Sequence, residues 1–207
     1  IAGYTWVVAA TVAIGILSFG LWIHHMFAVG LDIVALGIFS AASMLIALPN
    51  GVQFFAWLAT LWGGRPQLRV PMLYCLGFLF IFLIGGITGV MVAAAPFDWQ
   101  VHDTFFVVAH FHYVLVGGVV FPVIAGLYYW FPKWTGRVPR DGLGIASFWL
   151  LLAGFNVAFF PQHLLGFDGM PRRIFTYSAG EGWGAYNLIS SLGAAVIALG
   201  VLCIIVD

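Results

Sequence analysis

The chain has 207 residues, of which 63% are hydrophobic and only 7% are charged. Seven Lys and Arg residues balance seven Asp and Glu residues, which excludes both the basic surface of a nucleic-acid-binding protein and an acidic tail. A sequence this apolar indicates a membrane protein rather than a soluble domain with a large core. It starts at Ile1 in an apolar run, without an initiator Met or a basic leader region, so we interpret it as a piece of a longer membrane protein.

Gly, Pro and charged residues divide the chain into six apolar stretches, each with the length of a membrane-spanning helix. The predicted spans are residues 4–23, 33–62, 72–95, 105–131, 143–160 and 186–206. No repeat or linker separates them, so we predict an all-α, polytopic membrane helix bundle that forms a single membrane domain over residues 1–207. The second span is long and contains Pro49, which predicts tilt or a kink there.

The first predicted span ends in two adjacent histidines, His24 and His25. Neutral imidazole is a common ligand of copper and of haem iron, but neighbouring residues on a regular helix point in different directions. One metal can therefore bind both side chains only if the backbone departs from a regular helix at this end. The alternative is a pair of interfacial histidines that face water.

Polar side chains form a stripe along the second predicted span. At 3.6 residues per turn, four residues fall within an arc of about 140°; they are Ser40, Ser43, Asn50 and Gln53. Such a stripe can hold water and relay protons, or it can join neighbouring helices by hydrogen bonds. The sequence leaves both functions open.

The connection before the fourth span carries His102 and Asp103, a nitrogen and a carboxylate side by side. This combination suits a hard divalent ion. A solvated loop, in which Asp103 or Thr104 caps the following helix, explains the pair equally well.

Two histidines two residues apart, His110 and His112, lie inside the fourth predicted span. At about 100° per residue, their side chains leave a helix in directions roughly 200° apart. Ionisable residues at membrane depth are costly without partners and are functional candidates by default. The spacing favours a helix that presents one nitrogen ligand to each of two cofactors. The alternative is a pair of imidazoles that are hydrogen-bonded to neighbouring helices.

Basic residues concentrate in alternate connections, the second and the fourth, which the positive-inside rule makes cytoplasmic. These residues are Arg65, Arg69, Lys133, Arg137 and Arg140. Arg172 and Arg173 then lie on the outer side, where an anionic ligand or contact with lipid headgroups would explain them. In this orientation five of the six histidines also fall near the outer face.

Four segments of the sequence resemble, in the same order and at compatible distances, subunit I of the haem-copper oxygen reductases, the family of cytochrome c oxidase. They are WIHHMFAVGLD (22–32), ALPNGVQFFAWLATLWGG (47–64), HDTFFVVAHFHYVLVGG (102–118) and FFPQHLLGFDGMPRR (159–173). The resemblance covers nearly the whole chain. It implies helices seven to twelve of a twelve-helix subunit, in a bacterial-type plasma membrane or an inner mitochondrial membrane.

The resemblance also implies which residues bind the redox cofactors. His24 and His25 match two of the three copper ligands. His110 matches the ligand of a high-spin haem beside that copper, and His112 matches a ligand of a low-spin haem. Phe111, between the two haem ligands, matches a short through-bond link for electrons.

Two further pairs have counterparts in the family. His102 and Asp103 match ligands of a magnesium site above the haems, and Arg172 and Arg173 match the pair that holds haem propionates. In the family, the third copper histidine, its linked tyrosine and the other axial ligand of the low-spin haem lie upstream of the matching region. The chain alone can therefore complete neither the copper site nor the six-coordinate haem, and we expect it to be inactive in isolation.

The chain departs from the family at its proton channel. Gln53 and Asn50 stand where the family has a lysine and a threonine. Because neither amide titrates, a lysine-based proton route is in doubt here. A water-mediated stripe that includes Ser43, Asn50 and Gln53 remains an expectation for the proton path.

The function implied by the resemblance is terminal respiratory reduction of O₂ to water, coupled to proton uptake and translocation. The cofactors would be two haems, copper and magnesium. The expected partners are O₂, cytochrome c acting through a subunit II, other oxidase subunits and membrane lipid, with no nucleic acid. Two alternatives stay open at this point: a nitric oxide reductase of the same superfamily, and a membrane transporter whose histidines relay protons without redox cofactors.

Overall fold

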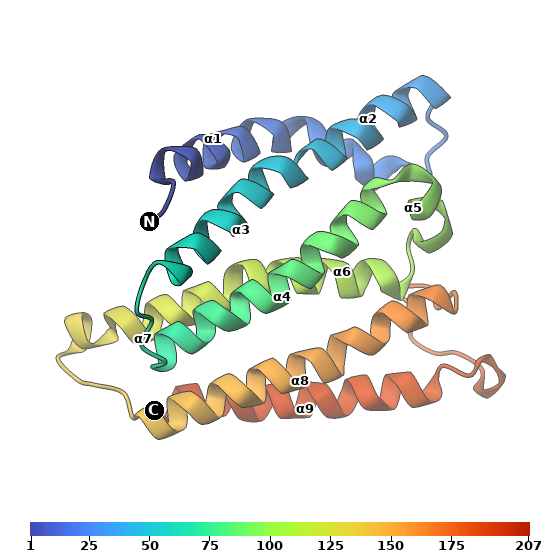
Figure 1. Cartoon of the computed structure of the whole chain (residues 1–207). Coiled ribbons are helices and arrows are strands. Elements are labelled where there is room, and N and C mark those ends of the chain that lie inside the picture. The colour runs from blue at the N-terminus through green and yellow to red at the C-terminus, as the bar shows by residue number, and fades with distance from the viewer. The chain divides into compact units, whose positions relative to one another are not determined.

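The computed structural model describes all 207 residues, and every regular element in it is a helix. The only extended pairing is an isolated antiparallel bridge between Thr104 and Pro171. Six helical stretches are long and apolar enough to cross a membrane; they are Tyr4–Met26, Ile33–Trp62, Val70–Ala93, Phe105–Thr135, Asp141–Phe167 and Gly184–Val206. The predicted all-α class and the six predicted spans are therefore confirmed (Figure 1).

Several spans contain more than one element. In chain order the elements are α1 Tyr4–Leu21, the 3₁₀-helix η1 Trp22–Met26, α2 Ile33–Leu45, α3 Ala47–Trp62, α4 Val70–Ala93, α5 Ala95–Val101, α6 Phe105–Leu115, the π-helical turn η2 Val116–Val120, α7 Phe121–Thr135, α8 Asp141–Phe167, the 3₁₀-helix η3 Ala179–Glu181 and α9 Gly184–Val206.

The second span is divided where its proline predicts a kink. α2 ends at Leu45, and α3 begins at Ala47 after a turn at Ile46. Pro49 has no N–H, and its ring would clash with the carbonyl four residues earlier, which belongs to Leu45. Helical hydrogen bonding therefore stops there, and the next helix starts with Pro49 in its first turn, where no N–H partner is needed.

The fifth span is longer than the sequence pattern predicts. The pattern predicts an end at residue 160, whereas α8 continues to Phe167 with Pro161 inside it. Pro161 removes one backbone hydrogen bond, yet at membrane depth the remaining backbone groups must still be satisfied within the helix. The extension places His163 on α8, where only 6% of the residue is exposed.

The chain divides into two compact units. The first comprises Ile1–Pro66 and Gly86–His102, and the second comprises Gln67–Gly85 and Asp103–Asp207. In the first unit, α1 lies along α3, and α2 contacts α1, α3 and α5. Its small core consists of Phe27, Leu36 and Ala95.

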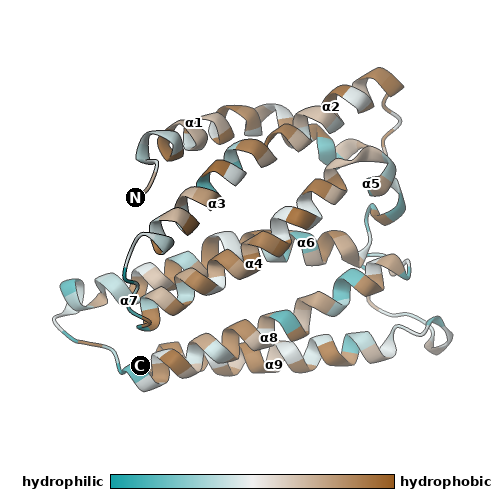
Figure 2. Cartoon of the chain, viewed as in Figure 1, coloured by the Kyte–Doolittle hydropathy of each residue, from teal (hydrophilic) through white to brown (hydrophobic).

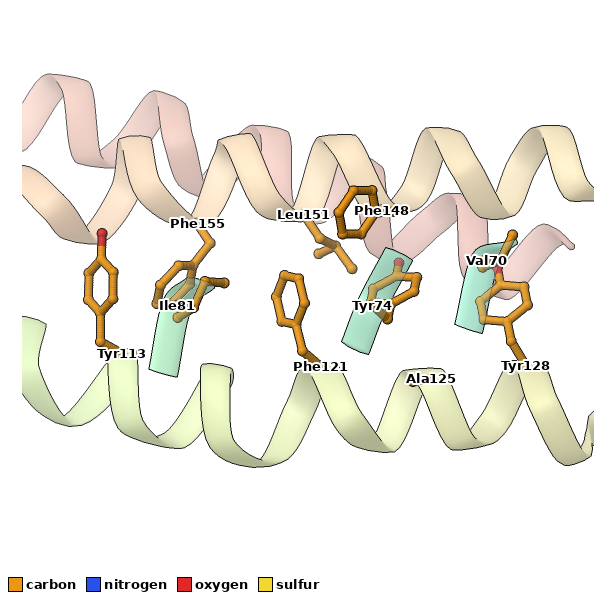
Figure 3. Packing of buried hydrophobic residues seen from close by; sticks show 10 residues of the cluster. All are labelled: Val70, Tyr74, Ile81, Tyr113, Phe121, Ala125, Tyr128, Phe148, Leu151 and Phe155. Atoms are coloured by element: carbon orange, nitrogen blue, oxygen red, sulfur yellow. The ribbon is translucent and has the colours of Figure 1, made fainter. Parts of the chain in front are cut away.

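The second unit is built on α8, which lies along α9 on one side and contacts α6 on another (Figure 1). Aromatic and aliphatic side chains from α4, α6, α7 and α8 form its core, as Figure 3 shows. The core residues are Val70, Tyr74, Ile81, Tyr113, Phe121, Ala125, Tyr128, Phe148, Leu151 and Phe155.

Glycines allow the helices of the second unit to approach closely. A Cβ atom on Gly193 of α9 would lie 2.7 Å from the Cα of Ala158 on α8, and one on Gly154 would lie 2.8 Å from the nitrogen of Ile197. Small residues at such contacts are typical of membrane helix packing, because backbone approach provides the van der Waals contact there.

The outer surfaces of the helices are also apolar. Figure 2 shows hydrophobic residues around the helices, with hydrophilic ones more frequent in the connections. Large side chains such as Phe19 and Trp62 are 92% and 94% exposed. Exposed apolar area of this extent requires lipid or further apolar helices around it.

Candidate metal and haem sites

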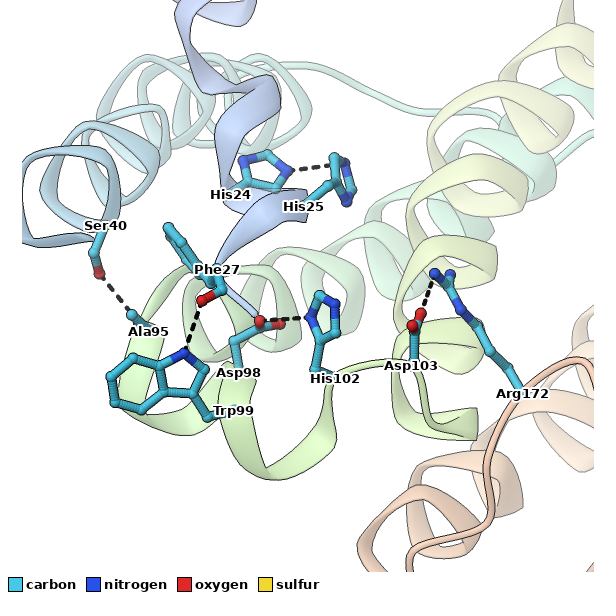
Figure 4. Close-up of polar contacts among 10 residues, drawn as sticks. All are labelled: His24, His25, Phe27, Ser40, Ala95, Asp98, Trp99, His102, Asp103 and Arg172. Atoms are coloured by element: carbon cyan, nitrogen blue, oxygen red, sulfur yellow. Dashed lines mark hydrogen bonds and ion pairs between the residues drawn. The ribbon is translucent and has the colours of Figure 1, made fainter. Parts of the chain in front are cut away.

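The end of the first span departs from an α-helix at its two histidines. His24 and His25 both lie on the 3₁₀-helix η1. Their Nε2 atoms are 3.0 Å apart, as drawn in Figure 4. With metal–nitrogen bonds of about 2.0 Å, that separation corresponds to a ligand–metal–ligand angle of about 97°. The two imidazoles therefore fit a single metal ion.

Neighbouring residues in the first unit hold this turn in place. The Ser43 hydroxyl donates to the carbonyl of Phe39 at 2.7 Å and lies 3.3 Å from Nδ1 of His24. Because the hydroxyl proton is already used, the oxygen accepts from an Nδ1–H of His24, which leaves the Nε2 lone pair for a ligand. The Trp99 indole also donates to the carbonyl of the buried Phe27, 3.0 Å away (Figure 4).

The predicted polar stripe of the second span makes hydrogen bonds within its own unit. Ser40 donates to the carbonyl of Ala93 and accepts from the nitrogen of Ala95. The Gln53 amide donates to the hydroxyl of Thr11 on α1 at 2.7 Å. Asn50 donates to a backbone carbonyl of its own helix, that of Ile46. The bonds of Ser40 and Gln53 join separate segments, as in the alternative in which the stripe links helices, whereas the bond of Asn50 does not.

His102 has a carboxylate partner other than its neighbour in the sequence, Asp103. Its Nδ1 lies 2.8 Å from Oδ2 of Asp98, one helical turn earlier, and Asp98 is only 4% exposed (Figure 4). The spacing of four residues was a usable signal, because side chains at i and i+4 meet on a helix. A carboxylate on Nδ1 fixes the ring orientation and leaves Nε2 available as a ligand.

Asp103 and Arg172 form an ion pair at the start of α6 (Figure 4). The backbone supports it, since the nitrogen of Arg172 donates to the carbonyl of Asp103 at 2.8 Å. Asp103 and Arg173 both have left-handed φ angles, 56° and 66°, and such backbone strain persists at sites where surrounding contacts enforce it. Arg172 also has a buried Nε atom without a hydrogen-bond partner.

α6 starts at a side-chain cap and carries the two predicted haem ligands. The Thr104 hydroxyl accepts from the nitrogen of Phe106 at 3.2 Å, which confirms one of the two caps that the sequence allows. The segment Phe105–Leu115 is a regular α-helix. His110 and His112 are both half-buried on it, and their side chains therefore leave the helix on nearly opposite sides.

The ring of His112 is held by three neighbours. Its Nδ1 lies 2.7 Å from the carbonyl of Val108. A carbonyl only accepts, so Nδ1 carries the proton and Nε2 has a free lone pair. The rings of Phe111 and of Phe159 on α8 lie nearly parallel to the imidazole, with centroid distances of 4.4 and 4.1 Å. Sequence spacing could not reveal the contact with Phe159, because it joins two separate helices.

The arrangement of each pair fits the group that the resemblance implies. His24 and His25 converge on one point, and His112 has the tautomer of a metal-bound histidine, in which the second ring nitrogen donates to a carbonyl. Within neither unit do three His, Cys, Asp or Glu side chains gather as a metal site.

The class of protein follows from the fold. The structure is similar to that of a heme-copper terminal oxidase dimer, with a TM-score of 0.80 over 90% of this chain and 38% of the other. The sequence identity is only 21%, so this likeness concerns the fold alone. The chain is therefore a membrane helix bundle with the fold of the haem-copper oxidases.

The family is defined by sequence. The family described as Cytochrome C and Quinol oxidase polypeptide I matches residues 1–196, and the chain belongs to it. It is 51% identical to cytochrome c oxidase subunit 1 of Bacillus sp. (strain PS3) and 48% identical to that of Bacillus subtilis (strain 168), over 99% of the chain and 33% of each relative. It is also 48% identical to a probable quinol oxidase subunit 1 of Staphylococcus aureus (strain USA300), over 31% of that protein. The chain thus spans about a third of the length of these relatives.

Proposed function

We propose that the protein containing this chain is a terminal respiratory oxidase that reduces O₂ to water. Family membership makes it an oxidase subunit of a respiratory chain, and its six apolar helices place it in a membrane. The observation that carries the proposal is the pair of histidines on α6, which leave one regular helix on nearly opposite sides. A proton relay needs no such divergence, whereas two haem ligands on one helix do.

In this proposal each histidine pair has a separate task. His110 and His112 each ligate one haem iron through a ring nitrogen, and Phe111 lies between them in the chain. His24 and His25 hold copper through the two Nε2 atoms that lie 3.0 Å apart. When bound, these groups supply one-electron carriers and a metal centre that takes O₂, which the protein side chains cannot supply.

The charged pairs complete the proposed sites. Arg172 and Arg173 hold haem propionates, for which the buried, unpartnered Nε of Arg172 is a fitting donor. His102 and Asp103 contribute to a magnesium site, with Asp98 fixing the His102 ring. We propose that these sites lie near the outer membrane face and that residues 1–207 act as one membrane domain.

The proton path stays a separate proposal. Ser43, Asn50 and Gln53 would guide water along the second span from the cytoplasmic side. All three side chains also make hydrogen bonds to protein groups, which supports a structural function for the stripe as much as a function in proton transfer.

Cytochrome c is the electron donor that we propose, with delivery through a second subunit. Relatives named as cytochrome c oxidases and as probable quinol oxidases are about equally similar to the chain, so quinol is the second candidate.

The proposed reaction is tested with the full-length, purified enzyme. We expect O₂ uptake when reduced cytochrome c is supplied, one copper per enzyme, and two haems that are spectroscopically distinct. O₂ uptake with quinol alone would replace cytochrome c as the donor. Nitric oxide consumption by an enzyme without copper would contradict the oxidase proposal in favour of a nitric oxide reductase. A protein without haem would contradict both and favour a transporter.

A further inference from the structure

One face of α8 contacts the helix that carries the haem ligands. Asn156, Phe159 and His163 follow each other at intervals of three and four residues, which places them on one side of a helix. The Tyr113 hydroxyl donates to Oδ1 of Asn156 at 2.8 Å. The ring of His163 lies 5.3 Å from that of Tyr113. Phe159 stacks on His112, so this face contacts α6 over two turns.

The contact between Tyr113 and Asn156 fixes the position of α8 relative to α6. Tyr113 is fully buried, and the amide of Asn156 is itself oriented by a 2.8 Å bond from its nitrogen to the carbonyl of Leu152. Gly166 also approaches the backbone of Phe106 so closely that any side chain there would displace it. A rotation or shift of either helix would break these contacts, so Phe159 is held at a defined position.

Two aromatic rings stack on the His112 ring. Phe111 belongs to the same helix, α6, whereas Phe159 belongs to α8. The centroids are 4.1 Å apart and the planes differ by 20°. The bond from Nδ1 to Val108 restrains the ring at one edge, and the phenyl face restrains the plane about that bond. Together with the ring of Phe111, which also stacks on the imidazole, they restrain the orientation of His112.

We propose that Phe159 is a positioning residue that sets the plane of the His112 imidazole toward its haem. The inference rests on the proposed ligation of the low-spin haem by His112. An axial imidazole interacts with the iron through orbitals whose overlap depends on the ring plane, and surrounding protein groups tune a haem through its axial ligand. Phe159 itself touches no iron, and its effect passes through His112.

The test uses electron paramagnetic resonance of the oxidised full-length enzyme, in which the g values of a low-spin haem report the orientation of its axial imidazoles. We expect Phe159→Leu, which keeps an apolar side chain but removes the flat face, to shift and broaden the largest g value. Phe159→Tyr keeps the flat aromatic face against His112 and should show the same g values as the parent enzyme. The optical band of the low-spin haem should shift in Phe159→Leu, while the high-spin haem band stays unchanged.

Phe160→Leu is the matched control, because Phe160 is the next residue on α8 and is 51% exposed. It should leave the low-spin signal at its parent position. Parent g values in Phe159→Leu, at full haem content, would overturn the positioning role. If Phe159→Leu does not accumulate, Phe159→Met provides the same comparison with a flexible side chain. Failure of the underlying ligation is distinguished by His112→Ala: a low-spin signal that persists there refutes the haem assignment itself.

Discussion

Replacement of His112 by alanine should abolish the low-spin haem signal of the full-length enzyme and leave the high-spin haem bound. The Nδ1–H of His112 donates to the carbonyl of Val108, so Nε2, with its free lone pair, is the ring nitrogen available to iron. Its side chain leaves α6 away from that of His110, so neither can replace the other. The reduced-minus-oxidised optical spectrum measures the outcome, and O₂ uptake should be lost with the low-spin band. In His112→Gly, added imidazole should restore part of the band.

His163→Gln is the matched control for this prediction. His163 is a buried histidine on the neighbouring helix whose Nε2 has no hydrogen-bond partner. If any buried imidazole in this region were needed only for packing, the two variants would behave alike. We expect His163→Gln to retain both haem bands. Low-spin absorption at the parent level in His112→Ala would contradict the assignment of this ligand.

Loss of either His24 or His25 should remove copper from the enzyme while both haems remain. The two Nε2 atoms converge on one position, and a metal that loses one of them keeps too few ligands to stay bound. Loss of a hydrogen bond that supports a metal ligand lowers metal affinity by about 10–100-fold. We expect loss of the ligand itself to lower copper affinity by more than that. Metal analysis of purified His24→Ala and His25→Ala enzymes measures the copper content, and O₂ reduction should be abolished.

Ser43→Ala gives a graded comparison for the copper site. The Ser43 oxygen is 3.3 Å from Nδ1 of His24, which is long for a hydrogen bond. Its removal should therefore weaken copper binding by about 10-fold, the lower end of such effects. Full copper occupancy in His24→Ala would show that this histidine is not a ligand. Equal copper loss in Ser43→Ala and His24→Ala would contradict the inference that the serine only supports His24 by a weak hydrogen bond.

The sequence was sufficient for the features that depend on local patterns. Apolar length predicted six spans, Pro49 predicted the break between α2 and α3, and the residues before α6 predicted a cap that Thr104 forms. These features depend on backbone chemistry and on transfer into lipid, both of which act residue by residue.

Contacts between helices could not be predicted in the same way. The stacking of Phe159 on His112 and the bond from Tyr113 to Asn156 join residues more than 40 positions apart. No periodicity within one helix specifies which face of another it meets. The sequence pattern also predicts an end of the fifth span at residue 160, seven residues before α8 ends at Phe167, because apolar length does not show that the helix continues through Pro161.

The predicted metal-ligand pairs show most clearly how far the sequence alone can predict the site. From the sequence, His24 and His25 can bind one metal only if the backbone there departs from a regular α-helix. The 3₁₀-helix η1 provides such a backbone. For His102, residue order suggested Asp103 as the companion, whereas the structure pairs its ring with Asp98 and pairs Asp103 with Arg172. The identity of the bound ions stays a prediction for all these residues.

The most direct measurement is a cryo-electron microscopy map of the full-length enzyme with its cofactors. We predict two macrocycles on different sides of α6, with iron about 2 Å from a ring nitrogen of His110 in one and from Nε2 of His112 in the other. A map in which the two rings bind the same group, or in which either ring contacts only neighbouring helices, would contradict the account.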